Sequence, residues 1–385
     1  MKNIIGPKVS GSDFFGREKE LKKMADNLAN PDVSLFIPGP RRTGKSSIVT
    51  EFSIRNCEQY KCLYFNLQGR FSIIQFCMDL KTEIEKNHPD IVKKKLSFLP
   101  AWNTFSAMIQ EIGISAIKIK TGKIEKAIEE ILSGTEDLFI KLKEEKFIII
   151  LDEFSDYILN LHKRNSDDVY VFLQWLRRQR EDNKIQFIIT GSVNIVSTLE
   201  EMDCIDLVNE MADIKMLPLT EKEVMKFLSM LLETEKKVLS PEAEDFAVEK
   251  LKDGIPFYVK LFAEELVNNV SECREIDLST MQSAYATIIN GNQKELVNMH
   301  SRLNKYLKKN EFEAAKKILA HLSHSSMGFD DLYPYIEKEA IDKNTAHKIL
   351  SRLIDESYIK NSRGKFSFVS QVVADWWKNK YGWEK

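Results

Sequence analysis

Cysteine is scarce in this chain of 385 residues, which contains only five. No two cysteines form a C-x-x-C pair, and none shows the spacing of a metal-ligand set. The pattern argues against a disulfide framework and against a zinc ribbon. We expect free and mostly packed thiols in a reducing compartment, at Cys57, Cys62, Cys77, Cys204 and Cys273.

Long apolar runs are also missing. Nowhere do about 18 apolar residues follow one another, which is roughly the length that a membrane-spanning helix needs. Met1 is followed by Lys2 and Asn3 with no long apolar stretch behind them, so the pattern of a signal peptide is not found. These two absences predict a cytoplasmic protein with no membrane partner.

Neither sign of charge is in excess. Lysine and arginine number 56 and aspartate and glutamate 58, so the formal net charge is -2. Such a chain is not a polyanion binder as a whole, and a nucleic-acid surface would have to be a local patch. Internal repeats and low-complexity linkers are absent too. The length and the hydrophobic content of 43% are sufficient for two or three packed domains.

The most informative motif that is present is Gly39-Pro40-Arg41-Arg42-Thr43-Gly44-Lys45-Ser46, which fits G-x-x-x-x-G-K-[ST] at each fixed position. A strand-like run precedes it and a helical pattern follows, which disfavours a chance glycine turn. Backbone N–H groups at such a turn form a nest for the α- and β-phosphates of a nucleotide. Lys45 can reach the β- and γ-phosphates, and the Ser46 hydroxyl can bind Mg²⁺. We include the adjacent Ser47 among the nucleotide-contacting residues.

Apolar runs and helical periodicity alternate along the first part of the chain. Five runs are typical of buried strands: Val33–Ile37, Cys62–Leu67, Phe147–Leu151, Gln186–Thr190 and, more weakly, Ile214–Leu217. We therefore predict an α/β fold with a doubly wound, parallel five-stranded P-loop NTPase sheet. From Thr220 onward helices dominate. The predicted domains are a P-loop ATPase core at 1–218, a helical lid domain at 219–290 and a winged-helix domain at 291–385.

The stretch between the second and third predicted strands is mostly helical by periodicity, from about Ile73 to Glu145. One segment within it, Ile114–Ile119, alternates in the manner of a strand. A helix is expected again over Ile124–Lys143, because its apolar residues recur on one face.

Asp152 and Glu153 end the third predicted strand. At the carboxyl end of a central strand beside the phosphate loop, Asp152 can hold Mg²⁺ through its water shell. Glu153 is placed to orient or deprotonate the attacking water. A solvated strand end would explain the pair alone, but together with the phosphate loop it favours Mg²⁺-dependent NTP hydrolysis. Thr190 closes the next strand and either contacts the γ-phosphate or lytic water, or caps the strand end.

The combination of these motifs resembles the archaeal-type ATPases of the STAND branch of AAA+ P-loop proteins, over nearly the whole chain. The phosphate loop and the Asp152-Glu153 motif are the specific parts of the resemblance. It also includes four weaker motifs, which are Phe14-Phe15-Gly16-Arg17-Glu18, Phe187-Ile188-Ile189-Thr190-Gly191-Ser192, Pro218-Leu219-Thr220 and Gly254-Ile255-Pro256.

The resemblance implies that the nucleotide is ATP, with ADP as the product. Phe15 and Gly16 would line the adenine, and the Arg17-Glu18 pair would brace the turn. Pro256 would contact the base or ribose from a lid, although a proline in the first turn of a helix needs no ligand. No Asn-Lys-x-Asp guanine-reading motif occurs in the sequence.

The sequence departs from ring-forming AAA+ machines at one place. Those machines usually carry an arginine between the fourth and fifth strands, whereas Val193–Asp213 contains neither Arg nor Lys. Arg177, Arg178 and Arg180 lie one helix earlier, and either contact a neighbour in trans or form a solvated basic face. Without charge neutralisation in trans, hydrolysis is slower by orders of magnitude. We predict a slow ATPase that acts as a nucleotide-controlled switch, with a protein partner or nucleotide-dependent self-association.

The last ninety or so residues contain three helical patterns followed by a hairpin pattern around Asn361–Gly364, which is typical of a winged helix. The alternative function is therefore a DNA-binding ATPase, similar to an initiator or a transposition helper. A packing module that reports the nucleotide state is the other interpretation, because Asp342, Asp355 and Glu356 dilute the basic patch. The residues that would face DNA are Lys343, Asn344, His347, Lys348, Ser351, Lys360, Arg363 and Lys365.

Two remaining features have structural explanations. His321 and His324 have H-x-x-H spacing, but no third ligand is evident, so a helix-end cap is favoured over a metal site. Trp376 and Trp377 are expected in the core, with stacking on single-stranded nucleic acid as the alternative.

Overall fold

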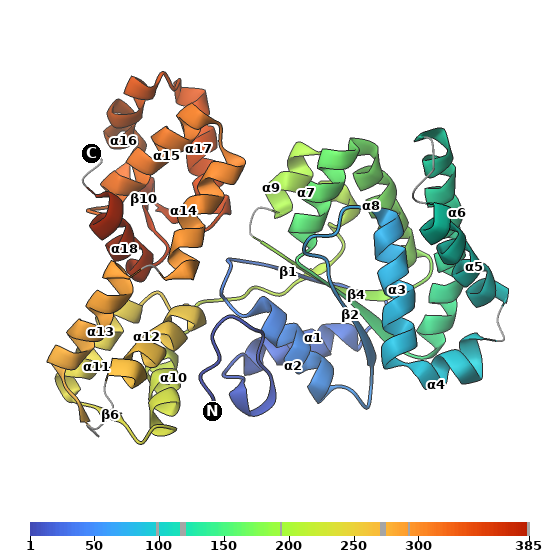
Figure 1. Cartoon of the computed structure of the whole chain (residues 1–385), viewed down its shortest axis with the longest axis horizontal. Coiled ribbons are helices and arrows are strands. Elements are labelled where there is room, and N and C mark those ends of the chain that lie inside the picture. Colours follow the sequence, from blue (N-terminus) through green and yellow to red (C-terminus); the bar gives the residue numbers. More distant parts are fainter. Residues whose placement is uncertain (98–99, 116–120, 193–194, 270–274, 292, 383–385) are drawn as a thin grey trace. The chain divides into compact units, whose positions relative to one another are not determined.

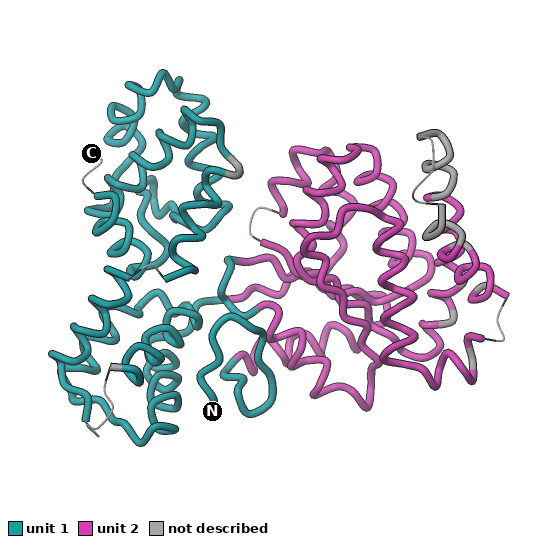
Figure 2. Tube along the Cα trace, viewed as in Figure 1, with its two compact units in different colours: residues 1–16, 40–44, 217–385 teal, residues 17–39, 45–216 magenta. Residues whose placement is uncertain are grey.

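The structure is a computed structural model that describes residues 1–97, 100–115, 121–192, 195–269, 275–291 and 293–382. The chain forms two compact units (Figure 2). Unit 1 comprises residues 1–16, 40–44 and 217–385, and unit 2 comprises residues 17–39 and 45–216. Among the described residues, no helix combines the length and the apolar character that crossing a membrane requires.

Unit 2 is built on a five-stranded sheet in which all paired strands are parallel, in the order β2-β3-β4-β1-β5 (Figure 1). This order requires crossovers from β1 past β4 and β3 to β2, which is the topology of a P-loop NTPase sheet. The predicted α/β fold class is therefore confirmed. The strands are β1 (Leu35–Pro38), β2 (Lys61–Asn66), β3 (Phe147–Asp152), β4 (Gln186–Gly191) and β5 (Ala212–Asp213).

The central strands are buried on both faces, which explains why their sequences are continuously apolar. Every residue of β3 and of β4 is buried. Alternate residues such as Ile149 and Phe187 belong to the main apolar cluster of the unit, while Ile148 and Ile188 are fully buried on the opposite face. Helices must therefore cover both sides of the sheet, as expected for parallel strands.

The fifth strand lies two residues earlier than the predicted run Ile214–Leu217. Ala212 and Asp213 pair with β1, and the ladder ends with a hydrogen bond from the Ile214 N–H to the Phe36 carbonyl. The pairing with β5 involves only Leu35 and Phe36, whereas β1 continues to Pro38 along β4. The fifth strand was therefore correctly predicted to exist, but its predicted position was wrong.

The described residues between Ile73 and Glu144 are mostly helical, as predicted. The β-like interpretation of Ile114–Ile119 is wrong for its first two residues, because Ile114 and Ser115 belong to α5; residues 116–119 lie outside the described residues. The helices of unit 2 are α1 (Glu18–Leu28), α2 (Lys45–Arg55), α3 (Ile73–Asn87), α4 (Pro89–Ile91), the π-helix η2 (Val92–Leu96), α5 (Pro100–Ser115), α6 (Thr121–Glu144), α7 (Phe154–Arg164), α8 (Ser166–Glu181), α9 (Ile195–Glu201) and the 3₁₀ helix η3 (Ile205–Leu207).

Unit 1 is mainly helical. Its strands are the short parallel pair β6 (Val238–Leu239) and β7 (Glu275–Ile276), and an antiparallel sheet in the order β8-β10-β9, with β8 (Met327–Gly328), β9 (Ile359–Ser362) and β10 (Lys365–Phe368). Its helices are η1 (Gly11–Asp13), α10 (Glu221–Glu233), α11 (Pro241–Leu251), α12 (Pro256–Asn269), α13 (Leu278–Asn290), α14 (Lys294–Tyr306), α15 (Lys309–Leu322), α16 (Phe329–Ile336), η4 (Glu337–Glu339), α17 (Lys343–Asp355) and α18 (Gln371–Tyr381).

Side-chain caps fix where several of these helices begin. Thr220 and Glu223 form a reciprocal capping box at α10, and Asp342 accepts the Thr345 N–H at the start of α17. A capping side chain accepts a hydrogen bond from a backbone N–H group that has no partner within the helix. The residues around the cap therefore determine where α10 and α17 begin.

One apolar cluster runs through unit 1, from Leu219 to Trp377. Trp376 and Trp377 have no exposed surface, which confirms that they are core residues. The three expected helices and the hairpin of the C-terminal part are present as α15, α16, α17 and β9–β10. The division of this unit into a lid domain and a third domain near residue 290 stays a prediction.

Candidate functional site

The phosphate loop connects β1 to α2. Its first glycine extends the β1–β4 ladder, because the Gly39 N–H donates to the Gly191 carbonyl at 3.2 Å. Lys45 is buried, and its Nζ donates to the Gly39 carbonyl at 2.8 Å. This hydrogen bond folds the lysine side chain back toward the first glycine of the loop. Ser46 and Ser47 follow in the first turn of α2, where the positive end of the helix dipole favours an anion.

The middle of the loop, residues 40–44, belongs to unit 1. Arg42 and Gly44 both have positive φ, at 70° and 95°, and left-handed residues within a turn create the concave backbone that binds anions. The Thr43 hydroxyl donates to the Pro40 carbonyl at 2.8 Å and tightens the turn. The Arg42 guanidinium lies 4.4 Å from the ring centroid of Phe257 in α12.

Asp152 ends β3 and is 2% exposed. Both of its carboxylate oxygens accept hydrogen bonds from hydroxyls: the Tyr64 hydroxyl donates to Oδ2 and the Thr190 hydroxyl donates to Oδ1. Thr190 also accepts the Glu153 N–H at 3.3 Å. The structure therefore brings together three of the residues that the sequence analysis selected in unit 2.

Glu153 directly follows β3 and lies in the turn between this strand and α7. It has a φ of 58° and is the N-cap residue of α7. A left-handed conformation at a non-glycine residue is uncommon and persists where surrounding contacts stabilise it. The turn at Glu153 therefore directs the chain away from β3 immediately after Asp152.

Tyr64 was not identified from the sequence. It lies in β2 two residues before Asn66, which is the register partner of Asp152. The alternation of β2 was the available signal: Leu63 and Phe65 are in the core, so Tyr64 must face the other side of the strand. Burial and the neighbouring Asp152 raise the pKa of Tyr64 above its ordinary value, so its hydroxyl stays protonated and remains a donor.

The residues at this edge fit a hard divalent cation. The Tyr64 hydroxyl holds the Asp152 carboxylate at the end of β3, and Ser46 lies in the first turn of α2, so two elements of unit 2 supply a carboxylate and a hydroxyl oxygen. Mg²⁺ prefers oxygen ligands and usually binds through one or two protein groups plus substrate phosphates. The described residues contain no group of three or more His, Cys, Asp or Glu that could hold a metal alone. His321 and His324 are not part of such a group.

The residues expected at the adenosine lie in unit 1. The Phe15 ring stacks on Phe227 of α10, with ring centroids 4.7 Å apart, and Gly16 has a φ of 68°. Pro256 is the first residue of α12. The preceding Gly254 has a φ of 62°, and a Cβ there would lie 2.0 Å from the Leu219 carbonyl oxygen. Their contact with a nucleotide stays a prediction.

Arg17 and Glu18, which were expected to brace the turn at Gly16, each form an ion pair within unit 2. Arg17 is buried and pairs with Glu20 at 3.0 Å. Glu18 pairs with Arg55 at the end of α2 at 2.6 Å. These contacts tie the start of α1 to the helix that follows the phosphate loop.

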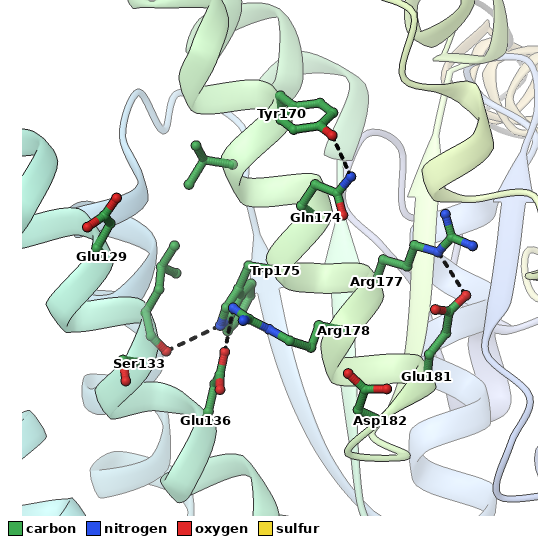
Figure 3. A pocket seen from close by; sticks show the side chains of 12 residues that line it. Glu129, Ser133, Glu136, Tyr170, Gln174, Trp175, Arg177, Arg178, Glu181 and Asp182 are labelled. Carbon is green, nitrogen blue, oxygen red and sulfur yellow. Dashed lines mark hydrogen bonds and ion pairs between the residues drawn. The ribbon is translucent and has the colours of Figure 1, made fainter.

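The three arginines of α8 already have carboxylate partners within unit 2. Arg177 pairs with Glu181 at 2.8 Å and Arg178 pairs with Glu136 at 2.7 Å. Arg180 is 4% exposed and pairs with Glu210, so a solvated basic face is the wrong description of this residue. Arg177 and Arg178 line a groove of about 730 Å³ between α6 and α8 (Figure 3).

The residues expected to face DNA are all exposed. They lie on α17 (Lys343, Asn344, His347, Lys348 and Ser351) and on the β9–β10 hairpin (Lys360, Arg363 and Lys365). The His347 ring stacks on Phe329 with centroids 3.9 Å apart, and Lys360 lies 3.9 Å from Asp253. These residues therefore form an exposed basic patch, and the Asp253 carboxylate lies close to one of its lysines, Lys360.

Comparisons with known proteins were made by sequence and by structure. A family described as an ATPase domain predominantly from Archaea matches residues 14–262. The chain is 30% identical over 151 residues to an uncharacterized ATP-binding protein of Methanocaldococcus jannaschii, covering 36% of this chain and 39% of that protein. It is 27% identical over 95 residues to an uncharacterized ATP-binding protein of Pyrococcus horikoshii, covering 23% and 30%. The chain thus matches less than half of the length of these relatives.

Two solved structures share the fold along nearly their whole length. A Walker-type ATPase of Pyrococcus abyssi aligns with a TM-score of 0.69 at 19% identity, covering 98% of this chain and 100% of that one. The ORC2 protein of Aeropyrum pernix, in complexes with ADPNP and ADP, aligns with a TM-score of 0.57 at 14% identity, covering 99% and 97%. Because the family match covers well over half of the sequence, from Phe14 to Phe262, the chain belongs to the family of ATPase domains found predominantly in Archaea.

Proposed function

We propose that this protein binds ATP with Mg²⁺, hydrolyses it slowly to ADP and phosphate, and uses the nucleotide state as a conformational switch. The observation that carries the proposal is the cluster at the end of β3, where Tyr64 and Thr190 hold the Asp152 carboxylate beside Glu153. The ATPase family and the ATP-binding names of the relatives support a nucleotide as the ligand. The absence of an Asn-Lys-x-Asp motif supports adenine over guanine.

In this proposal the phosphate loop holds the triphosphate. The N–H groups of the loop Gly39–Ser46, together with Ser47, contact the phosphates, and Lys45 exchanges its hydrogen bond with Gly39 for the β- and γ-phosphates. Ser46 and Asp152 hold the metal, which neutralises charge on the transferring phosphoryl group. Phe15, Gly16 and Pro256 contact the adenosine.

Glu153 acts as the general base on the attacking water. It accepts the water proton while the water oxygen attacks the γ-phosphorus and the bond to the β-phosphate oxygen of ADP breaks. Thr190 fixes the backbone of Glu153 and one oxygen of Asp152, so it positions both carboxylates. The Thr190 side chain contacts these protein groups, which is a role distinct from the direct contact with the γ-phosphate or water expected from sequence.

The switch is supported by contacts within unit 1 that lead from the phosphate loop to the C-terminal helix. Arg42 contacts Phe257, which directly follows Pro256. Asp253, just before Gly254, accepts the Gln371 N–H at the start of α18 at 2.5 Å. A change at the phosphate loop therefore has a physical route through α12 to the C-terminal part. Such a response, in a STAND-type protein with a lid at 219–290 and a winged helix at 291–385, suits a slow hydrolase.

The test of the enzymatic part is single-turnover hydrolysis by Glu153→Gln. We expect a fall of at least about 100-fold, since a positioned general base contributes about 10²- to 10⁴-fold. Glu58→Gln, at an exposed residue beyond α2, serves as the matched control and should hydrolyse at the wild-type rate. Equal rates for both variants would refute the role of Glu153.

The second candidate function is a DNA-binding ATPase, favoured by the exposed face of α17 and the β9–β10 hairpin. A winged helix would place α17 in the major groove and the hairpin against the backbone. Duplex binding should then weaken steeply with salt, and Lys348→Ala should reduce the slope by about one phosphate contact. Absence of duplex binding at low salt would eliminate this candidate and leave a protein partner or a second copy as the target of the switch.

A further inference from the structure

Tyr64 contacts the carboxylate that we assign to the metal. Its hydroxyl donates to Asp152 Oδ2, while the Thr190 hydroxyl donates to Oδ1. The hydrogen bond from Tyr64 therefore ties β2 to the end of β3. We propose that Tyr64 is a positioning residue that holds Asp152 in the orientation that Mg²⁺ requires. The inference rests on the proposed Mg²⁺-ATP function.

The geometry of Asp152 explains why a second donor matters. The torsion that rotates an aspartate carboxylate is broad, so one hydrogen bond does not fix the plane of the group. Thr190 holds one oxygen and Tyr64 holds the other, and together they fix the plane. A carboxylate has about four acceptor sites, so both oxygens can still accept a metal-bound water.

The register of the sheet brings Tyr64 to this carboxylate. The strands β2 and β3 pair with Tyr64 opposite Ile150 and Asn66 opposite Asp152, so Tyr64 lies two residues before the partner of Asp152 and on the same face of β2 as that partner. From this position its hydroxyl reaches Asp152 Oδ2.

The experiment measures ATP affinity by calorimetry with Mg²⁺ and with EDTA, for wild type and for Tyr64→Phe. The ratio of the two affinities is the metal-dependent gain. Outer-shell partners of metal ligands contribute about 10- to 100-fold to metal affinity. We expect Tyr64→Phe to reduce the gain about tenfold and to change the metal-free affinity less than about twofold, and Asp152→Asn to reduce the gain at least as much.

Tyr60→Phe is the matched control. The Tyr60 hydroxyl is also buried and donates to the Leu28 carbonyl at 3.0 Å, but it contacts no group assigned to the metal. It should destabilise the fold to a similar degree in thermal unfolding without changing the metal-dependent gain. A purely structural role of Tyr64 would give the same result for both variants.

Two results would overturn the inference while leaving the proposed function intact. One is a metal-dependent gain in Tyr64→Phe equal to that of wild type. The other is an equal loss of affinity with Mg²⁺ and with EDTA, which would mean that Tyr64 supports the nucleotide site in general. If wild type itself shows no metal-dependent gain, both the inference and the assignment of Ser46 and Asp152 to the metal are wrong.

Discussion

Replacing Thr190 by valine removes one hydroxyl and keeps the shape of the side chain. Thr190 is 1% exposed, so water cannot replace the lost group. The hydroxyl donates to the charged Asp152 carboxylate, and a hydrogen bond to a charged group contributes about 1.5–3 kcal/mol. It also accepts the Glu153 N–H at 3.3 Å, a longer and weaker bond whose loss adds at most about 1 kcal/mol. Thr190→Val should therefore reduce the free energy of unfolding by about 2–4 kcal/mol.

The same change should slow single-turnover hydrolysis by about 10- to 100-fold, because Asp152 and Glu153 both lose an orienting contact. Affinity for ATP in EDTA should stay within about twofold of wild type, since Thr190 contacts neither Lys45 nor the loop amides in our proposal. The assays are urea unfolding followed by tryptophan fluorescence, single-turnover hydrolysis with labelled ATP, and calorimetry.

Thr135→Val provides the control. Thr135 is fully buried in α6, and its hydroxyl donates to the neutral Leu132 carbonyl at 2.6 Å. We expect a loss of stability of about 1 kcal/mol with no change in hydrolysis. If Thr190→Val hydrolyses ATP as fast as Thr135→Val, Thr190 has no positioning role and the interpretation of the cluster is wrong.

Three further predictions concern the loop, the lid and pH. Gly254→Ala should destabilise unit 1 by about 3 kcal/mol or more in thermal unfolding, since its Cβ would lie 2.0 Å from the Leu219 carbonyl oxygen. Gly364→Ala is the control and should lose about 1 kcal/mol, because the space around Gly364 is open. Equal losses in the two variants would contradict the close approach at Gly254. Arg42→Ala should abolish the nucleotide-dependent change in hydrogen exchange of α12, and an unchanged response would refute the route through Phe257. Burial lowers the pKa of His88 from its ordinary 6.5, so its stabilising contribution is fully present above about pH 6.5 and is lost as the pH falls through the lowered value. His88→Gln should therefore flatten the fall in melting temperature between about pH 7 and pH 5, and a profile parallel to wild type would exclude this histidine as the cause.

Much of unit 2 could be predicted because its signals are local. The loop Gly39–Ser46 has a fixed spacing, and the strands buried on both faces have continuous apolar sequences. Parallel strands place their carboxyl ends at one edge of the sheet, and Asp152 and Thr190, which were selected as strand-end residues, are hydrogen-bonded there. In these places, local pattern and tertiary structure agree.

The features that escaped prediction depend on register and on packing between distant segments. Tyr64 reaches Asp152 only because β2 and β3 pair in one register, which nothing in either strand specifies alone. Arg180 looks like a surface residue in the sequence of a charged helix, but it packs against the segment that carries Glu210. The fifth strand was displaced because the residues that pair with β1 are Ala212 and Asp213, which precede the apolar run at Ile214–Leu217 and carry no apolar strand pattern of their own.

The most direct test of the account is the calorimetric titration of wild type and Lys45→Ala with Mg²⁺-ATP. Lys45 is buried, and its ammonium donates to the carbonyl of Gly39, the first glycine of the phosphate loop. The account predicts saturable binding by wild type and a loss of at least about 100-fold in affinity for the variant, as expected for removing a charged partner from a phosphate site. Folded wild-type protein that gives no binding signal, or a variant that binds as tightly as wild type, would contradict it.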